Sequence, residues 1–558
     1  MTPPSLILGP LLRYAGERAA TVWVETDGAC DVAVRLEDGS EHRSPSFHVE
    51  GHNYALVHVT GLPPGERYGY EVLLDGERRW PQPDSPFPPS VIRAYDPNAS
   101  FSLAFGSCRV SLPNRAPYTL TRSQDKRGRG TGALYTLARR MQGQPMDAWP
   151  DALLMLGDQI YADDVSPGTR EFIRTRRGTK SGPGEQVADF QEYTHLYYDA
   201  WGDPMLRWLL STVPVAMIFD DHDVHDDWNA SEAWVKKMRE KPWWNERITG
   251  GFMSYWIYQH LGNLSPAELA KDELLRRVLE AEDAGPVLRE FARRADREPG
   301  ASRWSYYRDF GNTRLIVLDT RAGRVLEEGR RSMLDPAEWS WVEEHATGGF
   351  DHLLIGSSVP AFMAPGLHEL EAWNEAVCGG AWGRAAAKIA EILRQAVDLE
   401  HWSAFQSSFN ELVDLLGRVG AGERGDPPAS ITVLSGDVHH GYLAEVEYPH
   451  DLNLQSAVYQ AVCSPLRNTL GIPEQLAMRA GWSRLGERVC RALARAAGIK
   501  PAGVSWRLTH EKPWFENHVG TVELKKRQAN LKVERTVPAG TKDPDKARLE
   551  KILEHELA

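Results

Sequence analysis

The sequence predicts an α/β protein with an all-β unit at its N-terminus. Residues 1 to about 95 alternate apolar and polar side chains in short segments, as half-buried strands do. From about residue 100 the pattern changes to short, almost wholly apolar runs separated by helical or loop segments. Such runs are typical of strands in sheets that are covered on both faces. The chain has 558 residues and is 42% hydrophobic, which is enough for a large packed core.

The N-terminal unit is predicted to be a β-sandwich over residues 1–95. Its clearest alternating segments are residues 21–25, 31–36 and 54–59. Residues 62–72, Leu-Pro-Pro-Gly-Glu-Arg-Tyr-Gly-Tyr-Glu-Val, resemble the turn and tyrosine corner of a fibronectin type III sandwich. We therefore expect the hydroxyl of Tyr68 or Tyr70 to bond back to upstream backbone. Five prolines within residues 80–89 predict a stiff connector to the next unit.

Six apolar runs define the second unit, which is predicted over residues 96–535. The runs are residues 101–105, 152–156, 213–219, 315–318, 352–355 and 431–434. Helices are expected at 267–281 and 385–397, basic Gly-rich loops at 121–130 and 170–184, and a β-hairpin at 520–535. Residues 536–558 are expected to form a C-terminal tail, with a charged surface helix from Pro544 onwards.

Polar residues follow these apolar runs directly. The runs lead into Gly-Ser-Cys-Arg at 106–109, Gly-Asp-Gln-Ile-Tyr at 157–161, Asp-Asp-His-Asp at 220–223, Asp-Thr-Arg at 319–321, Gly-Ser-Ser at 356–358 and Ser-Gly-Asp-Val-His at 435–439. In sheets of this kind, ligands bind in the crevice beyond the carboxyl ends of the strands. The sequence therefore predicts that these polar side chains converge on one site.

The predicted crevice carries more negative charge than carboxylates can hold unaided. Asp158, Asp220, Asp221, Asp223 and Asp437 all follow buried runs, and like charges at one site raise one another's pKa. A single Gly-Asp pair is more often a turn, but three such clusters after three strands favour a site with bound metal ions, which supply the missing positive charge.

Composition excludes several other classes of protein. The formal net charge of -13 predicts a surface that as a whole repels nucleic acid and anionic membranes. Five scattered cysteines are a poor disulfide framework, and most of them, Cys108 excepted, are expected to be ordinary reduced cysteines. No run of about 18 apolar residues suggests a membrane span. The N-terminus lacks a basic region and a long apolar stretch, so a cytoplasmic location is expected, or a secreted one if a leader was removed.

Three of the polar clusters resemble the motifs of calcineurin-like metallophosphoesterases in their alkaline phosphatase D (PhoD-like) form. These are the clusters at 157–161, 220–223 and 435–439, and in that form a cysteine after the first strand, here Cys108, replaces the usual Asp-x-His. The resemblance spans residues 1 to about 530, because that family also carries a fibronectin-like N-terminal domain. It implies a four-layer α/β/β/α domain that hydrolyses phosphomonoesters or phosphodiesters with a metal-bound hydroxide at a two-metal site.

The resemblance also implies which residues hold the metal ions. The ligands implied for a ferric ion are Cys108, Asp158, Tyr161 and His439. Asp158 is then expected to bridge to a second ion, which Asp221 and Asp437 also hold. Other metallophosphatases place a histidine from a middle strand on this second ion, but Gly-Ser-Ser at 356–358 offers none. An oxygen-only site suits a hard divalent ion, Ca²⁺ or Mg²⁺, better than zinc.

The remaining functional roles are also implied by the resemblance. His222 corresponds to the catalytic histidine that stabilises the phosphoryl oxygens or protonates the leaving group; the alternative is a histidine bonded to a neighbouring carboxylate for structure. Arg109 is a candidate contact of the substrate phosphate, and a surface or helix-capping arginine is the alternative. Asp223 stands where the family usually has Glu, and Asp227 is expected to replace or supplement Asp221 on the second metal.

Two other phosphate-handling schemes fit less well. A cysteine-nucleophile phosphatase needs Cys-x5-Arg, but the sixth residue after Cys108 is Asn114, with Arg115 one position too far. The His222-Asp223 pair is like that of helical HD-type phosphohydrolases, but here it follows an apolar β-run. Rival functions are a phosphodiesterase for nucleotides, cell-wall polymers or phospholipid head groups, and a catalytically lapsed metal-binding protein, against which the intact ligand set argues.

Overall fold

The computed structural model describes residues 3–558 and begins with two antiparallel sheets. The first contains β1 (Leu6–Ala15), β2 (Ala19–Thr26), β6 (His52–Thr60) and β5 (Phe47–Val49), in that order. The second contains β4 (Glu41–Pro45), β3 (Asp31–Leu36), β7 (Arg67–Leu74) and β8 (Glu77–Trp80), and β9 (Val91–Arg93) pairs with β7. Valines from both sheets, such as Val22 and Val72, share one buried core. The predicted all-β N-terminal unit is confirmed.

The prediction that the Tyr70 hydroxyl forms a tyrosine corner in this unit is wrong. The Tyr70 hydroxyl donates to the carbonyl oxygen of Ser211 over 2.7 Å, rather than to upstream backbone of its own sheet. Ser211 lies in helix α4 (Pro204–Thr212), which belongs to the second part of the chain. A packed helix therefore supplies the acceptor that the corner would otherwise provide. Tyr68 is half-buried and packs against the sandwich core.

The second part of the chain contains two larger sheets. One has the order β12 (Val215–Ile218), β11 (Ala152–Leu156), β10 (Phe101–Gly106), β20 (His518–Lys525), β21 (Gln528–Val537), β22 (Arg548–Glu556). The other has the order β13 (Tyr306–Phe310), β14 (Thr313–Leu318), β15 (His352–Ser357), β16 (Ser430–Ser435), β18 (Ala457–Val462), β17 (Tyr442–Glu447), β19 (Ser505–Leu508). All six apolar runs are strands, as predicted, and so is the hairpin β20–β21.

The two sheets stack face to face. A β-carbon at Gly356 in β15 would lie 3.3 Å from a methyl group of Leu156 in β11, so the two sheets are in close contact at this glycine. Strands β10, β11 and β12 are mutually parallel, and so are β14, β15, β16 and β18. The carboxyl ends of the parallel strands within each sheet therefore lie at one edge of it, as the polar clusters predicted.

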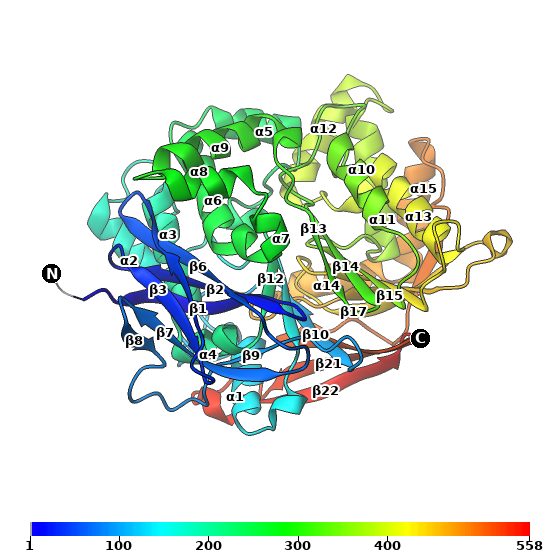
Figure 1. The fold of residues 1–558 in the computed structure, drawn as a ribbon. Helices are drawn as coiled ribbons and strands as arrows, with labels where there is room; N and C mark the ends of the chain where they lie inside the picture. Colours follow the sequence, from blue (N-terminus) through cyan, green and yellow to red (C-terminus); the bar gives the residue numbers. More distant parts are fainter. Residues whose placement is uncertain (1–2) are drawn as a thin grey trace.

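Helices cover the outer faces of both sheets, which gives the four layers α/β/β/α (Figure 1). The first group is α1 (Ala133–Gln142), α2 (Pro167–Arg176), α3 (Phe190–Trp201), α4, α5 (Glu232–Arg239), α6 (Trp244–Ser254), α7 (Pro266–Leu269), α8 (Glu273–Glu280) and α9 (Gly285–Arg297). The second group is α10 (Pro336–His345), α11 (Pro365–Cys378), α12 (Arg384–Ala396), α13 (Gln406–Gly420), α14 (Ile472–Gly481) and α15 (Arg484–Ala496). Within residues 3–558, no helix combines the length and the hydropathy needed to cross a membrane.

Helix predictions were partly wrong. The predicted helix at 385–397 is α12, but that at 267–281 is divided into α7 and α8, because Asp272 caps a new helix start. The loop predicted at 170–184 is helical as far as Arg176. Ser166 caps this helix by accepting from the backbone of Thr169, and Pro167 occupies its first turn, a pair that favours helix initiation.

The helix predicted in the C-terminal tail is a strand. Only the single turn Pro544–Lys546 is helical, and β22 then pairs antiparallel with β21 along its length. The charged composition of residues 548–556 favours a helix locally, but the open edge of β21 presents unpaired backbone N–H and C=O groups. Pairing with that edge satisfies the groups and decides the conformation. In Figure 1 these C-terminal strands, in red, extend the sheet that contains β10, β11 and β12.

Arg13 joins the N-terminal unit to the rest of the protein. Its side chain is fully buried, although it lies in strand β1, and it donates to the carbonyl oxygens of Val215 (3.2 Å) and Gln259 (2.6 Å) and to that of Tyr258. The hydroxyl of Tyr258 in turn donates to Glu25 over 2.8 Å. Buried hydrogen bonds of Arg13 and Tyr258 therefore join the two parts of the chain.

Replacing Arg13 with alanine is expected to lower the free energy of unfolding by at least about 3 kcal/mol, because three buried carbonyl groups lose their charged donor. The midpoint of urea unfolding measures this. Exposed Arg18, at the end of the same hairpin, is the matched control, and Arg18→Ala should change stability by no more than about 0.5 kcal/mol. Equal losses in the two variants would mean that Arg13 does not join the two parts.

Candidate active site

The loops that follow the strands of the two sheets are joined at the predicted site. The backbone N–H of Asp437, after β16, donates to the hydroxyl of Ser107, after β10, over 3.0 Å. The N–H of Cys108 donates to the carbonyl of Gly157, after β11. Side chains that are far apart in the sequence therefore lie on loops that are hydrogen-bonded to one another.

Asp223 holds two of these loops together. Its carboxylate accepts from the N–H of Asp158 (3.0 Å), the N–H of Asp220 (2.9 Å) and the side-chain amide of Gln259 (3.0 Å). Burial raises the pKa of Asp223 to about 7. With both oxygens occupied, this carboxylate fixes the geometry of the site.

The backbone at the site is strained. Cys108, Asp158, Asp437 and His439 have φ of 55°, 53°, 66° and 50°, a left-handed conformation that is uncommon outside glycine. Such strain is held in place only by surrounding structure and concentrates at functional sites. Position 157, with φ of 99°, requires glycine, since a β-carbon there would lie 2.5 Å from the β-carbon of Asp220.

The residues expected to hold a ferric ion lie together. Cys108, Asp158 and His439 each offer a donor atom, and these atoms lie within 4.8 Å of one another. The hydroxyl of Tyr161 donates to Asp158 Oδ2 over 3.2 Å, so the phenol borders the same cluster. Burial lowers the pKa of His439 to about 4, which leaves the imidazole neutral, as a metal ligand must be.

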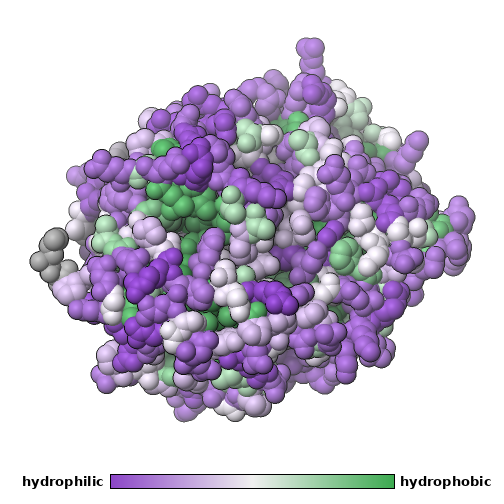
Figure 2. All heavy atoms as spheres, viewed as in Figure 1, coloured by the Kyte–Doolittle hydropathy of each residue, from purple (hydrophilic) through white to green (hydrophobic). Residues whose placement is uncertain are grey.

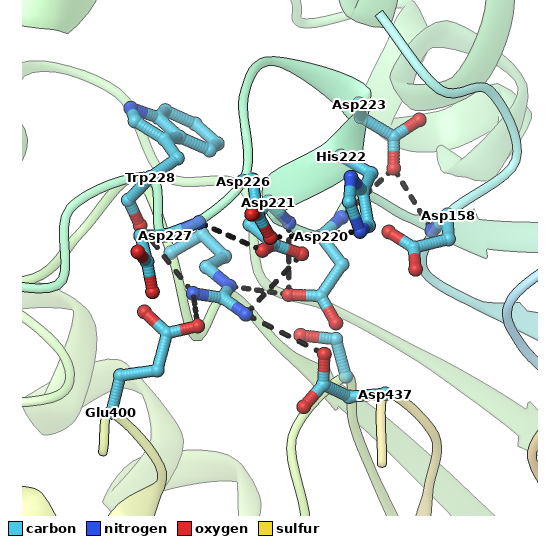
Figure 3. Close-up of polar contacts among 12 residues, drawn as sticks. Asp158, Asp220, Asp221, His222, Asp223, Asp226, Asp227, Trp228, Glu400 and Asp437 are labelled. Atoms are coloured by element: carbon cyan, nitrogen blue, oxygen red, sulfur yellow. Dashed lines mark hydrogen bonds and ion pairs between the residues drawn. The ribbon is translucent and has the colours of Figure 1, made fainter. Parts of the chain in front are cut away.

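The carboxylates expected at the second ion form an adjoining cluster. Asp220, Asp221 and Asp437 form one close set of possible ligands, and Asp158, Asp221 and His222 form another, so Asp158 and Asp221 connect the two halves of the site (Figure 3). Within the described chain, Asp158 Oδ1, Asp220 Oδ2 and Asp221 Oδ1 are buried and accept no hydrogen bond. Unpaired buried carboxylate oxygens are costly unless a cation faces them, so the residues present fit bound metal ions.

Arg321 lies among these carboxylates and was not assigned a role from the sequence. Its guanidinium is fully buried, pairs with Asp220 through Nε, and lies 2.6 Å from Glu400 Oε1. Its Nη2 is 3.5 Å from Asp221 and 3.7 Å from Asp437. This one guanidinium therefore faces four carboxylates, and Glu400 is shared with Arg324, whose Nη1 lies 3.2 Å from Glu400 Oε2. The sequence feature that could have identified Arg321 is Asp-Thr-Arg at 319–321, directly after the fourth apolar run.

His401 also contacts the second cluster. Its Nε2 lies 2.8 Å from Asp437 Oδ2 and its Nδ1 lies 2.7 Å from Glu371 Oε1. Burial lowers the pKa of His401, but Glu371 and Asp437 outweigh burial and raise it well above its usual range. The sequence predicted only oxygen ligands around the second ion, and the structure adds an imidazole beside one of them. His401 follows no strand, so the strand-end pattern did not reveal it.

His222 faces the site from the same loop as Asp221. Its Nδ1 lies 2.9 Å from Asp163 Oδ1, and its side chain keeps 22% of its surface exposed. Burial lowers the pKa of His222, but Asp163, Asp221 and Asp158 outweigh burial and raise it well above its usual range. The carboxylate partner fixes one side of the ring, while the ring still borders open space.

Two other predicted residues lie differently. Arg109 is 5% exposed and donates to the carbonyl of Ala200, near the end of α3, over 2.7 Å. It does not line the cavity of about 300 Å³ that opens over the clusters, so the structure favours the helix-capping alternative over a contact with substrate. Asp227 lies beside Asp221, to which its N–H donates over 3.1 Å. Burial and, as the next largest cause, the negative charge of Glu400 raise the pKa of Asp227 to about 9.

A cavity of about 300 Å³ opens over the clusters. Its polar lining includes Asp221, His222, His401, Asp437 and His439. Its apolar lining is Met363, Leu367, Val397, Leu399, Val438, Leu470 and Met478. A ligand in this cavity therefore meets both acidic and apolar side chains.

Comparison with known families agrees with this geometry. Residues 129–480 match the family described as PhoD-like phosphatase. The chain belongs to the PhoD-like phosphatase family. It is thus a phosphatase, an enzyme that hydrolyses phosphate esters, and the family depends on metal ions. Residues 3–92 of this phosphatase match a domain of unknown function, DUF7800.

One solved structure, titled "Structure of PhoD", resembles the phosphatase over its whole length. It has a TM-score of 0.57 at 12% sequence identity, and the match covers 99% of this chain and 93% of the other. At this identity it supports the fold. A maltogenic amylase from S. marinus has a TM-score of only 0.17 at 9% identity, with 94% of this chain and 76% of the other covered. A type III pullulan hydrolase from Thermococcus kodakarensis has a TM-score of only 0.14 at 12% identity, with 95% of this chain and 94% of the other covered. No curated protein matches the sequence.

Proposed function

We propose that the phosphatase hydrolyses phosphate monoesters or diesters at a two-metal site. Cys108, Asp158, Tyr161 and His439 would hold a ferric ion. Asp158, Asp221 and Asp437 would hold a hard divalent ion, Ca²⁺ or Mg²⁺. The observation that carries the proposal is the set of buried, unpaired carboxylate oxygens beneath the cavity. When bound, the two ions would neutralise the phosphate oxygens and make an attacking water more acidic.

The protein's own groups orient the substrate and move its proton. His222 lines the cavity, and Asp163 fixes its Nδ1 and stabilises the imidazolium form. A protonated His222 can donate from Nε2 to a phosphoryl oxygen or to the oxygen of the leaving group. Arg321 and Asp223 do not line the cavity, and they hold the carboxylates in place from behind.

A phosphodiesterase is the second candidate, and the cavity wall favours it. The apolar side chains that line the cavity, such as Leu367 and Met478, offer a surface for a second ester group. A monoester has one organic group, so it leaves part of this wall without a partner.

Metal analysis combined with turnover tests the proposal. Protein isolated aerobically should contain iron and be coloured by charge transfer from Tyr161 or Cys108 to Fe(III). It should also hydrolyse p-nitrophenyl phosphate or bis-p-nitrophenyl phosphate, and the ratio of the two rates separates the two candidates. Colourless, iron-free protein with full activity would overturn the iron assignment. A metal-loaded protein that hydrolyses neither ester would be a metal-binding protein and no enzyme.

A further inference from the structure

Exposed apolar residues are concentrated on three helices. Of twelve large hydrophobic residues that are exposed within the described chain, nine lie between residues 382 and 493. They are Trp382 before α12, Ile389 and Ile392 on α12, Val397 after it, Ile472 and Leu476 on α14, and Leu485, Val489 and Leu493 on α15. We call these nine the α12–α15 surface. Hydrophilic residues cover most of the face in Figure 2, which also shows smaller hydrophobic areas. A concentration of exposed apolar residues marks an interaction site.

The three helices belong to one lobe. Each packs against α11, and the indole N–H of Trp382 donates to the carbonyl of Ala496 at the end of α15 over 3.2 Å. A β-carbon at Gly366 in α11 would lie 2.9 Å from the carbonyl oxygen of Gly481, which ends α14, so these elements are in close contact. Figure 1 shows α11, α12 and α15 side by side at one end of the molecule.

The apolar stripe of α15 points away from the protein. Leu485, Val489 and Leu493 recur every four residues, so they share one face of the helix, and Leu485 is 72% exposed. Ala494, on the opposite face, is buried. An amphipathic helix of a globular protein normally buries its apolar stripe. α15 does the reverse, which indicates that another apolar phase covers the stripe.

Basic residues accompany the stripe. Residues 471–500 contain six Lys and Arg and two Asp and Glu, in a chain with a formal net charge of -13. Arg484, Arg488 and Arg495 are exposed and lie along one side of the stripe on α15. Two copies of this face would bring like charges together, which disfavours a dimer. Anionic lipid head groups above an apolar interior complement both features.

We propose that the α12–α15 surface docks onto an anionic lipid bilayer. The leucines, isoleucines and valines enter the head-group region, and the arginines beside them bind the lipid phosphates. Val397 belongs both to this surface and to the lining of the catalytic cavity, so docking brings the mouth of the cavity to the membrane. This docking goes beyond the proposed hydrolysis and does not depend on it.

Co-sedimentation of the metal-loaded protein with vesicles tests the proposal. Binding should be strong to phosphatidylcholine vesicles that contain about 30 mol% phosphatidylglycerol, weak without the anionic lipid, and reduced by about 0.5 M KCl. The variant Leu485→Gln/Val489→Gln should bind at least about tenfold more weakly. Leu279→Gln is the matched control, since Leu279 is 51% exposed but lies on α8, away from the surface.

Turnover of p-nitrophenyl phosphate without vesicles should be unchanged in both variants, which shows that they are folded and active. The proposal is overturned if the wild-type protein ignores anionic vesicles, or if Leu279→Gln weakens binding as much as the double variant does. A concentration-dependent dimer in analytical ultracentrifugation that the double variant abolishes would also overturn it, because the surface would then join two copies of the chain.

Discussion

The His222→Ala enzyme is expected to keep its metal ions while its kcat on an alkyl phosphate falls by about 10²–10⁴-fold, the usual contribution of one acid–base group. The reason is geometric. His222 lines the cavity and is held by Asp163, whereas the carboxylates that face the cation sites remain in place without it. Steady-state kinetics beside metal analysis of the same preparation measures both quantities. His225→Ala, in the same loop but outside the cavity lining, is the matched control.

The substrate distinguishes the two roles of His222. An aryl phosphate with a good leaving group needs no proton, so its hydrolysis should be less affected if His222 is the acid. Equal losses on aryl and alkyl substrates would assign His222 to electrostatic stabilisation of the phosphoryl oxygens instead. Stoichiometric loss of a metal ion in His222→Ala would contradict both roles.

Asp163 links this prediction to pH. The carboxylate raises the pKa of His222 against the effect of burial, and the protonated form is the one that acts as acid. Asp163→Asn removes the charge, so the pKa of His222 should fall by about one unit or more. Activity is then lost at a lower pH, and the alkaline limb of the pH–rate profile should move toward acid. An unshifted limb would mean that His222 is not the group that titrates.

The strand-end pattern predicted much of the site because it follows from topology. A short parallel strand that is covered on both faces has an apolar sequence, and its carboxyl end lies at a fixed edge of the sheet. Asp158, Asp221 and Asp437 could be placed together for this reason, although nearly 280 residues separate the first from the last. Arg321 carried the same signal after the fourth run.

The strand-end pattern could not locate functional groups on irregular segments. His401 and Glu400 lie between α12 and α13, where their positions depend on how α11 and α13 pack. The C-terminal strand β22 depends on the free edge of β21, a partner that the local sequence does not contain. The direction of Arg109 depends on the left-handed turn at Cys108, which tertiary contacts impose. Each of these features is decided by non-local contacts.

The Asp221→Ala enzyme is expected to lose the second metal ion and at least about 10³-fold in kcat, since one bound ion contributes several kcal/mol to stabilising charge in the transition state. Within the described chain, Asp221 Oδ1 is buried and accepts no hydrogen bond, and Arg321 Nη2 is too distant, at 3.5 Å, to satisfy it fully. This oxygen is therefore free for a cation. Elemental analysis should find iron retained and the divalent ion absent.

Two variants separate the loss of the ligand from damage to the loop. Asp221→Asn keeps an oxygen that can accept from the N–H of Asp227, a bond that spans 3.1 Å in the structure, but removes the charge. It should lose the divalent ion as Asp221→Ala does, whereas Asp164→Ala, at an exposed carboxylate, should retain both ions and full activity. Added Ca²⁺ or Mg²⁺ should restore part of the turnover of the Asp221 variants by mass action. If Asp221→Ala retained both ions and normal kcat, the second metal would be held without Asp221, and Asp227 would become the first ligand to test.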